Sequence, residues 1–235
     1  MKKIDNKYLD FYNENGYLIV ENVIDDKECD YFLNLFKEYS LKNGNNEFSE
    51  IPQVHRCIPE TLRLMKNEKV VDIIESLLDG ESVGLQTVCG FKKPNTPSGN
   101  MAWNPHQDGT YIDIDKEKYV SGDIVLDDHK EDSGVLYVYP GSHKESLLDY
   151  EPNKSFGDLK GNPGNRVLNV PNKYGIKKLI LKKGSFLSFH SNLIHGSFKN
   201  TSKSNWRPIL LMAFMRSGAS YNPGQKAKRT PIELR

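Results

Sequence analysis

The feature that most constrains the fold is a series of short apolar segments separated by turn residues in the second part of the chain. Candidate strands lie at 82–91, 123–126, 135–139, 179–181, 185–190 and 209–215. Residues rich in Gly, Pro and Ser separate them, as at 93–99, 140–142 and 182–184. Many short strands separated by turns are typical of a β-sandwich or barrel. We therefore expect a mainly β domain.

The first 81 residues have a helical pattern instead. An aspartate at position 25 or 26 can cap a helix whose apolar residues recur at helical spacing from Cys29 to Tyr39. A second helix begins near Asn67 and ends at Gly80. Residues 17–20 are apolar and short enough to form an edge strand. We expect this region to be a mainly helical support for the strands.

A chain of 235 residues with 37% apolar residues is consistent with one domain, because all-β domains often reach this size undivided. We predict helical support at 1–81, a β core at 82–217 and a tail at 218–235. The basic residues of the tail indicate a solvated segment rather than a binding patch. Residues 144–178 are long, aperiodic and rich in Gly, Pro and Asn, which favours a lid over the barrel mouth, with disorder as the alternative.

Charge and cysteine content restrict the partners and the compartment. The chain has 32 basic and 31 acidic residues, so neither nucleic acid nor an acidic membrane surface is expected as a partner. The odd number of cysteines, three in all and widely spaced, argues against a disulfide framework. No apolar run approaches the ~20 residues that span a bilayer. We expect a cytoplasmic protein with a small-molecule substrate; the sequence does not predict its oligomeric state.

Two residues of a ligand type flank Gln107 in the sequence His106-Gln107-Asp108. On a β-strand, side chains at i and i+2 point to the same side, so His106 and Asp108 can bind one metal ion. A second histidine, His195 at the end of an apolar segment, would complete a two-histidine, one-carboxylate set. Taken alone, a histidine in a strand is more often structural than a ligand, and Asp108 before Gly109 is compatible with a plain turn. Composition and spacing together leave the metal site and a structural role equally open.

The order of several motifs along most of the chain resembles the phytanoyl-CoA dioxygenase family of Fe(II)- and 2-oxoglutarate-dependent oxygenases. The N-terminal segment 12–20, followed by a helix, is similar to the start of that family. The later matching segments are Phe91-Lys92-Lys93-Pro94, His106-Gln107-Asp108-Gly109, Asp132-Ser133-Gly134, Pro140-Gly141-Ser142-His143-Lys144, Phe189-His190 and His195-Gly196-Ser197. The combination is specific to the family, although no single segment is.

This resemblance implies a double-stranded β-helix, a jelly roll of the cupin-like barrel type, with flanking helices. It also implies that His106, Asp108 and His195 bind Fe(II), with 2-oxoglutarate and O2 as cosubstrates. The implied reaction is hydroxylation of an aliphatic carbon of a small molecule, with release of succinate and carbon dioxide. Related halogenases replace the aspartate with a small residue, so Asp108 favours hydroxylation, desaturation or ring formation over halogenation.

The resemblance assigns three further residues to the cosubstrate. Arg207 matches the arginine that binds the distal carboxylate of 2-oxoglutarate, and a guanidinium suits that role because it pairs with a carboxylate through two hydrogen bonds. Ser197 matches a hydroxyl contact, and Lys92 matches a lysine found in some members. Alternatively, Arg207 is a surface charge and Lys92 a solvated turn residue.

Candidate substrate contacts come from strand parity and from an unusual charge. Gln86 shares the parity of Lys92, so it faces the pocket if Lys92 does. Asp123 stands where relatives carry an apolar inward residue, and a buried carboxylate needs a partner. We expect it to meet a substrate amine or hydroxyl, or a neighbouring Lys or Arg. Tyr111 lines the pocket or packs as a structural aromatic.

The other four histidines are not expected to be ligands. His143 belongs to the Pro-Gly-Ser-His turn, and His190 would face away from His195 on a continuous strand. His55 and His129 have no supporting context and are expected at the surface.

Two other classes of protein stay open on sequence alone. One is a cupin-like metal isomerase or sugar-binding protein, which usually holds its metal with more histidines and does not need Arg207. The other is a catalytically silent barrel whose metal site persists without turnover.

Overall fold

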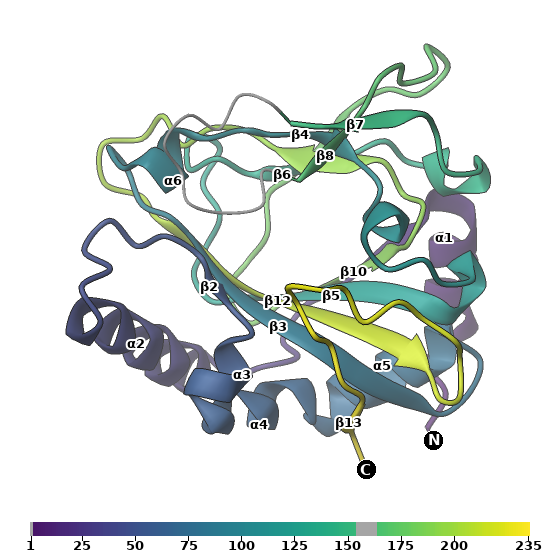
Figure 1. Ribbon diagram of the computed structural model, residues 1–235, viewed down its shortest axis with the longest axis horizontal. Coiled ribbons are helices and arrows are strands. Elements are labelled where there is room, and N and C mark those ends of the chain that lie inside the picture. The colour runs from purple at the N-terminus through teal and green to yellow at the C-terminus, as the bar shows by residue number, and fades with distance from the viewer. Residues whose placement is uncertain (1, 154–163) are drawn as a thin grey trace.

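The computed structural model describes residues 2–153 and 164–235. Two antiparallel β-sheets face each other, and helices cover the outer face of the larger sheet (Figure 1). The two sheets have the arrangement of an open double-stranded β-helix, as predicted.

The larger sheet has the strand order β1-β10-β5-β12-β3-β13, with β2 also paired to β3. Its strands are β1 (Tyr17–Val20), β2 (Ile51–Pro52), β3 (Ser82–Lys92), β5 (Tyr119–Val125), β10 (Phe186–His190), β12 (Arg207–Arg216) and β13 (Ile232–Glu233). The strands predicted at 82–91, 123–126, 185–190 and 209–215 all lie in this sheet. β3 and β12 are the two longest strands, and their pairing fixes which side chains of the sheet lie opposite one another.

The smaller sheet has the order β4-β11-β6-β9, and a separate hairpin joins β7 to β8. These strands are β4 (Trp103–His106), β6 (Leu136–Val138), β7 (Tyr150–Pro152), β8 (Asn165–Val167), β9 (Lys177–Leu179) and β11 (His195–Ser197). The apolar segment before His195 is not a strand, and β11 begins at His195 itself. β10 ends at His190, where the Leu193 amide donates to the His190 carbonyl and forms a turn before β11.

The helices are α1 (Asn6–Asn15), α2 (Asp26–Lys42), α3 (Val54–Cys57), α4 (Leu62–Met65), α5 (Glu68–Leu77) and α6 (Pro97–Asn100). Single 3-10 turns are η1 (Pro59–Thr61), η2 (Asp108–Tyr111), η3 (Lys116–Lys118) and η4 (Ser142–Lys144). The side chain of Asp25 caps α2 and that of Asn67 caps α5, as the sequence predicts.

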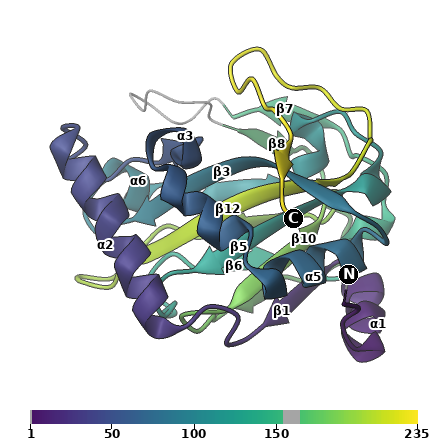
Figure 2. The ribbon, with the colours of Figure 1, turned by 90° about the horizontal axis from the view of Figure 1, so that it is seen from below.

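Helices α2, α4 and α5 run across the outer face of the large sheet (Figure 2). Phe32, Phe36 and Ile74 from these helices are completely buried against Cys89 and Leu210 of the sheet. These apolar contacts cover one face of β3 and β12. The opposite face of the same strands points toward the smaller sheet, and the interior between the two sheets is called the pocket below.

The C-terminal segment is not the solvated tail that was predicted. Its strand β13 pairs with β3, and Leu234 is buried in the core. Arg235 forms ion pairs with Asp72 and Glu75 of α5. The segment has few apolar residues, but its backbone completes the edge of the large sheet, which composition could not reveal.

The predicted lid at 144–178 contains the β7–β8 hairpin and ends at β9. Residues 154–163 of this segment lie outside the described residues, so its role as a lid stays a prediction.

His129 is buried, although it was expected at the surface. Its backbone amide donates to the Leu181 carbonyl, which folds the connection after β5 back onto the domain. His55 is half-buried and its ring nitrogen Nδ1 lies 2.9 Å from the hydroxyl of Thr87.

Among the described residues, no helix is long and apolar enough to cross a membrane.

Candidate metal centre

His106, Asp108 and His195 meet at one end of the pocket. β4 and β11 pair so that His195 lies opposite His106, with the ring centroids 4.3 Å apart. Asp108 opens the turn η2 directly after β4, and the extended backbone of Gln107 turns Asp108 to the side of His106. One ligand atom from each of the three residues lies within 4.8 Å of the others. The three predicted ligands thus share one buried point.

Both imidazoles are held with the same nitrogen toward this point. Nδ1 of His106 donates to the Asn104 carbonyl at 2.8 Å, and Nδ1 of His195 donates to the Leu193 carbonyl at 3.0 Å. Each Nε2 is therefore left with its lone pair, 3.7 Å from Oδ1 of Asp108. Burial, reinforced by His195, lowers the pKa of His106 to about 4, which keeps that ring neutral at pH 7.

Asp108 is fixed from the large sheet. The hydroxyl of Ser121 on β5 donates to Oδ2 of Asp108, which leaves Oδ1 directed at the two imidazoles. A carboxylate held in this way by a hydroxyl keeps its orientation when a cation approaches. Ser121 was not predicted, because a serine inside an apolar strand has no signal in the sequence.

Gln107 faces away from the metal point, as predicted, and ties the motif to the surrounding loops. Its side-chain amide donates to the Asn192 carbonyl at 2.8 Å and accepts from the Leu148 amide at 2.9 Å. Gly196 permits the close approach of β11 to its neighbours, because a Cβ there would lie 2.5 Å from the Trp103 carbonyl and 2.4 Å from the Tyr137 hydroxyl.

Arg207 lies at the far end of the large sheet from this cluster, opposite Lys92 in the pairing of β12 with β3. It is buried, and neither Nε nor Nη1 has a hydrogen-bond partner among the described residues. Burial lowers the pKa of Arg207 to about 10, so the guanidinium is still charged at pH 7. A buried cation with unpartnered donors calls for an anionic ligand. The alternative of a surface charge is therefore wrong.

Lys92 is also buried, so it is not a solvated turn residue. Its ammonium donates to the carbonyls of Met101 at 2.6 Å and Phe198 at 2.5 Å. Burial, and then the nearby Arg207, holds the pKa of Lys92 well below its usual range. Ser197 on β11 is buried, and its hydroxyl has no partner among the described residues.

Asp123 lies on the same face of β5 as Ser121, the inward position that the comparison with relatives predicted. It is 1% exposed, and its Oδ1 has no hydrogen-bond partner among the described residues. Burial raises the pKa of Asp123 to about 7, while Arg207 acts in the opposite direction. Glu50, which the sequence did not suggest, interacts electrostatically with both Arg207 and Lys92. Glu50 is accessible to solvent although protein surrounds it, as expected for a side chain lining an open cavity.

Gln86 and Tyr111 lie on the opposite side of the pocket from Arg207. Gln86 is half-buried and accepts a hydrogen bond from Arg229 at 2.6 Å. The ring of Tyr111 lies 6.2 Å from that of His106, and its hydroxyl accepts from the Asn165 amide at 2.7 Å. Tyr111 is thus close to the metal point, whereas Gln86 lies two strands away from Ser121 in the sheet. Contact of either residue with a substrate stays a prediction.

His143 and His190 lie together in a different cavity of about 350 Å³, bounded also by Tyr12 and Glu117. Their rings are 5.1 Å apart. Neither belongs to the ligand cluster found among the described residues.

The sequence profile of phytanoyl-CoA dioxygenase (PhyH) matches residues 12–209 of this chain. The chain belongs to the phytanoyl-CoA dioxygenase family. It is 26% identical to the phytanoyl-CoA dioxygenase of Arabidopsis thaliana, over 84% of both chains. It is 23% identical to the peroxisomal enzyme of Homo sapiens, with 81% of this chain matched, but spans only 62% of that relative. An ectoine dioxygenase of Bordetella bronchiseptica is 23% identical over 90% of this chain and 75% of its own.

Solved structures agree on the fold. A carbocyclase from nogalamycin biosynthesis superposes with a TM-score of 0.75 at 19% identity, covering 95% of this chain and 88% of its own. An epimerase solved with Fe³⁺, α-ketoglutarate and a nogalamycin compound has a TM-score of 0.72 at 16% identity, covering 93% and 86%. The predictions of the family, of its double-stranded β-helix and of a 2-oxoglutarate-dependent dioxygenase are confirmed. The predicted cofactors, Fe(II) and 2-oxoglutarate, suit the donor set of the pocket.

Proposed function

We propose that this protein hydroxylates an aliphatic carbon of a small molecule, with 2-oxoglutarate and O2 consumed and succinate and carbon dioxide released. The observation that carries the proposal is the pairing of two sites in one pocket. One site is a cluster of three buried ligands with both Nε2 atoms directed inward, and the other is a buried arginine with unpartnered donors.

In this proposal, Nε2 of His106, Nε2 of His195 and Oδ1 of Asp108 hold the iron on one face. The bound iron, with 2-oxoglutarate, supplies the oxygen activation that side chains alone cannot perform. The carbonyls that accept from the two Nδ1 atoms, and the hydroxyl of Ser121, keep the three ligands in place when the metal arrives.

The cosubstrate site is assigned to Arg207, Ser197 and Lys92. Arg207 pairs with the distal carboxylate of 2-oxoglutarate, since its Nε and Nη1 are buried and unpartnered. The Ser197 hydroxyl contributes a further hydrogen bond. Two of the three N–H donors of Lys92 are already taken by carbonyls, so Lys92 has one donor left for the cosubstrate.

The substrate then occupies the side of the pocket formed by Gln86 and Tyr111. For Asp123, the electrostatic attraction to Arg207 supports the neighbouring arginine as its partner, with a substrate amine or hydroxyl as the other candidate. An unchanged substrate affinity in Asp123→Asn would exclude the substrate as that partner.

Two further properties belong to the proposal. We place the protein in the cytoplasm, supported by three free cysteines, two of them buried. We also propose that it acts without nucleic acid or membrane partners, which is supported by the near balance of basic and acidic residues.

The test is an anaerobic titration with Fe(II) and 2-oxoglutarate, followed by oxygen and a succinate assay. We expect a metal-to-ligand charge-transfer band and slow succinate formation in the wild type, and loss of both in Arg207→Ala. Absence of band and succinate in the wild type contradicts the proposal. A metabolite screen coupled to succinate release, with product mass spectrometry, then separates hydroxylation from desaturation and ring formation.

A further inference from the structure

The C-terminal segment between β12 and β13 crosses the edge of the large sheet near β3 and is fixed there by hydrogen bonds (Figure 1). Gln53 donates to the Ala227 carbonyl at 3.1 Å, and Arg56 donates to the Lys228 carbonyl at 2.6 Å. The Tyr221 hydroxyl donates to the Arg229 carbonyl at 3.1 Å. Three contacts to main-chain carbonyls thus fix the backbone at residues 227–229, up to and including Arg229.

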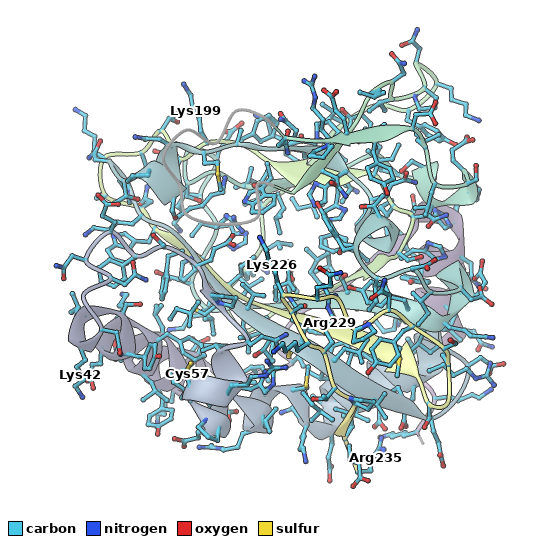
Figure 3. All side chains as sticks on the ribbon, in the orientation of Figure 1. Lys42, Cys57, Lys199, Lys226, Arg229 and Arg235 are labelled. Atoms are coloured by element: carbon cyan, nitrogen blue, oxygen red, sulfur yellow. The ribbon has the colours of Figure 1, made fainter. Side chains whose placement is uncertain are left out.

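The Arg229 side chain is directed into the pocket. Its Nε donates to Oε1 of Gln86 at 2.6 Å, and its Nη1 lies 3.4 Å from the Tyr111 carbonyl. Both acceptors are neutral, and the guanidinium forms no ion pair with a carboxylate of the described residues. Arg229 is half-buried, so its charge is neither fully solvated nor paired. A second cation on the same segment, Lys226, is exposed and lies in front of the opening between the sheets in the view of Figure 3.

The register of the large sheet gives the position of Arg229 relative to the metal cluster. Gln86 pairs with Ala213, and Ala213 pairs with Ser121, which holds Asp108. Side chains of directly paired residues lie on the same face of a sheet, and neighbouring strands are about 4.8 Å apart. The Gln86 side chain is therefore about 10 Å from Ser121, two strands away. That separation suits one small molecule lying between Arg229 and the metal cluster.

We propose that Arg229 binds an anionic group of the substrate, a carboxylate or a phosphate ester, and so selects substrates by charge. The inference rests on the proposed function, because it takes the reacting carbon to lie at the metal cluster. Gln86 accepts from Nε and the Tyr111 carbonyl accepts from Nη1, so the two acceptors orient the guanidinium. The remaining N–H donors of Nη1 and Nη2 are left for the anion. Arg207 serves the cosubstrate at the other end, so the two arginines bind two different anions.

The test compares matched ligands that differ in charge. Hexanoate, hexyl phosphate and hexanamide are titrated by calorimetry into anaerobic protein loaded with Fe(II) and saturating 2-oxoglutarate, so that the Arg207 site is filled. We expect at least one of the two anions to bind about tenfold more tightly than the amide, the gain of one charge-assisted hydrogen bond. Which anion binds more tightly distinguishes a carboxylate substrate from a phosphate ester.

Variants of Arg229 then test whether this residue causes the preference for anions over the amide. Arg229→Gln and Arg229→Met should reduce it to within about twofold, and Arg229→Lys should retain part of it. The matched control is Lys199→Gln, an exposed lysine on the opposite side of the molecule, which loses the same charge and should keep the full preference (Figure 3).

Three results overturn the proposal. They are no anion preference in the wild type, no binding of either anion, and a full preference in both Arg229→Gln and Arg229→Met. The last, accompanied by a lower melting temperature, would show that Arg229 only fixes the C-terminal segment. If the charge-transfer band and succinate are present, these results remove the Arg229 proposal alone. If band and succinate are both absent, the proposed function fails, and this inference with it.

Discussion

The two ends of the pocket differ in how completely their polar groups are hydrogen-bonded. At the metal end, Nδ1 of both imidazoles and Oδ2 of Asp108 are occupied by protein partners, so only the atoms that face a cation are left. At the Arg207 end, Nε and Nη1 of Arg207 and Oδ1 of Asp123 have no partner among the described residues.

This difference shows how one pocket receives two unlike ligands. A metal ion needs ligand atoms that are already oriented, because its coordination geometry tolerates little rearrangement. The cosubstrate carboxylate brings its own hydrogen-bond acceptors, so the protein leaves donors open for it. Mutations at the metal end should therefore lower the affinity for the metal ion. Mutations at the Arg207 end should lower the affinity for 2-oxoglutarate.

The largest effect is expected from removing a ligand at the metal end. His195→Ala should weaken Fe(II) binding by at least about 100-fold, more than the loss of an outer hydrogen bond to a ligand. Anaerobic Fe(II) titration followed by calorimetry measures this. The control is His55→Ala, a half-buried histidine bonded to Thr87 on the far face of β3. If the two variants bind iron equally well, the assignment of the metal end is wrong.

Next comes the loss of the guanidinium at the other end. Arg207→Ala should raise the Kd of 2-oxoglutarate by roughly 100-fold, because two charge-assisted hydrogen bonds are lost. Its affinity for Fe(II) alone should change little, which separates the two ends. Arg216→Ala, an exposed arginine at the other end of β12, is the matched control. A parallel loss of Fe(II) affinity in Arg207→Ala contradicts the division of roles.

A smaller effect is expected from the hydroxyl that orients Asp108. Ser121→Ala should weaken Fe(II) binding by roughly tenfold, since the carboxylate is free to rotate. Ser188→Ala on neighbouring β10 removes a buried hydroxyl that has no partner among the described residues, and it should leave iron affinity unchanged. Equal iron affinity in both variants would show that Ser121 only fills space.

The smallest effect concerns the pH dependence of stability at the Arg207 end. The pKa of Asp123 is raised from 3.8 to about 7, so the folded state retains a proton that the unfolded state has lost between these values. The free energy of unfolding should therefore fall as pH rises toward 7 and level off above it. Between pH 6 and pH 8 this amounts to about 1.4 kcal/mol, which Asp123→Asn should abolish. Urea denaturation of metal-free protein at both pH values measures it, and a pH dependence in Asp123→Asn equal to that of the wild type contradicts the assignment.

The long central strands and the ligand positions could be predicted from sequence because they depend on local patterns. The predicted strands at 82–91 and 209–215 match β3 and β12 to within two residues. The convergence of His106, Asp108 and His195 followed from motif order, and the structure brings the three together.

Contacts between distant polar residues could not be predicted. Arg229 and Gln86 are 143 residues apart, and nothing in the composition of the C-terminal segment distinguishes a pocket residue from a solvated one. The burial of His129 depends likewise on how the connection after β5 folds back. Such contacts depend on how strands pair across the whole domain. The local hydrophobic pattern of a single sequence does not reveal that pairing.

The pairing of Gln86, Ala213 and Ser121 across three strands has a consequence for regioselectivity. If Arg229 binds one end of the substrate, the distance between the strands determines which carbon of the substrate lies at the metal cluster and is oxidised. Ala213 is the middle residue of this row, and it is buried in an apolar cluster with Leu85, Ile112 and Tyr119. A larger side chain there, as in Ala213→Leu, has to displace these neighbours between the two anchors, and should shift the position of hydroxylation along the substrate chain.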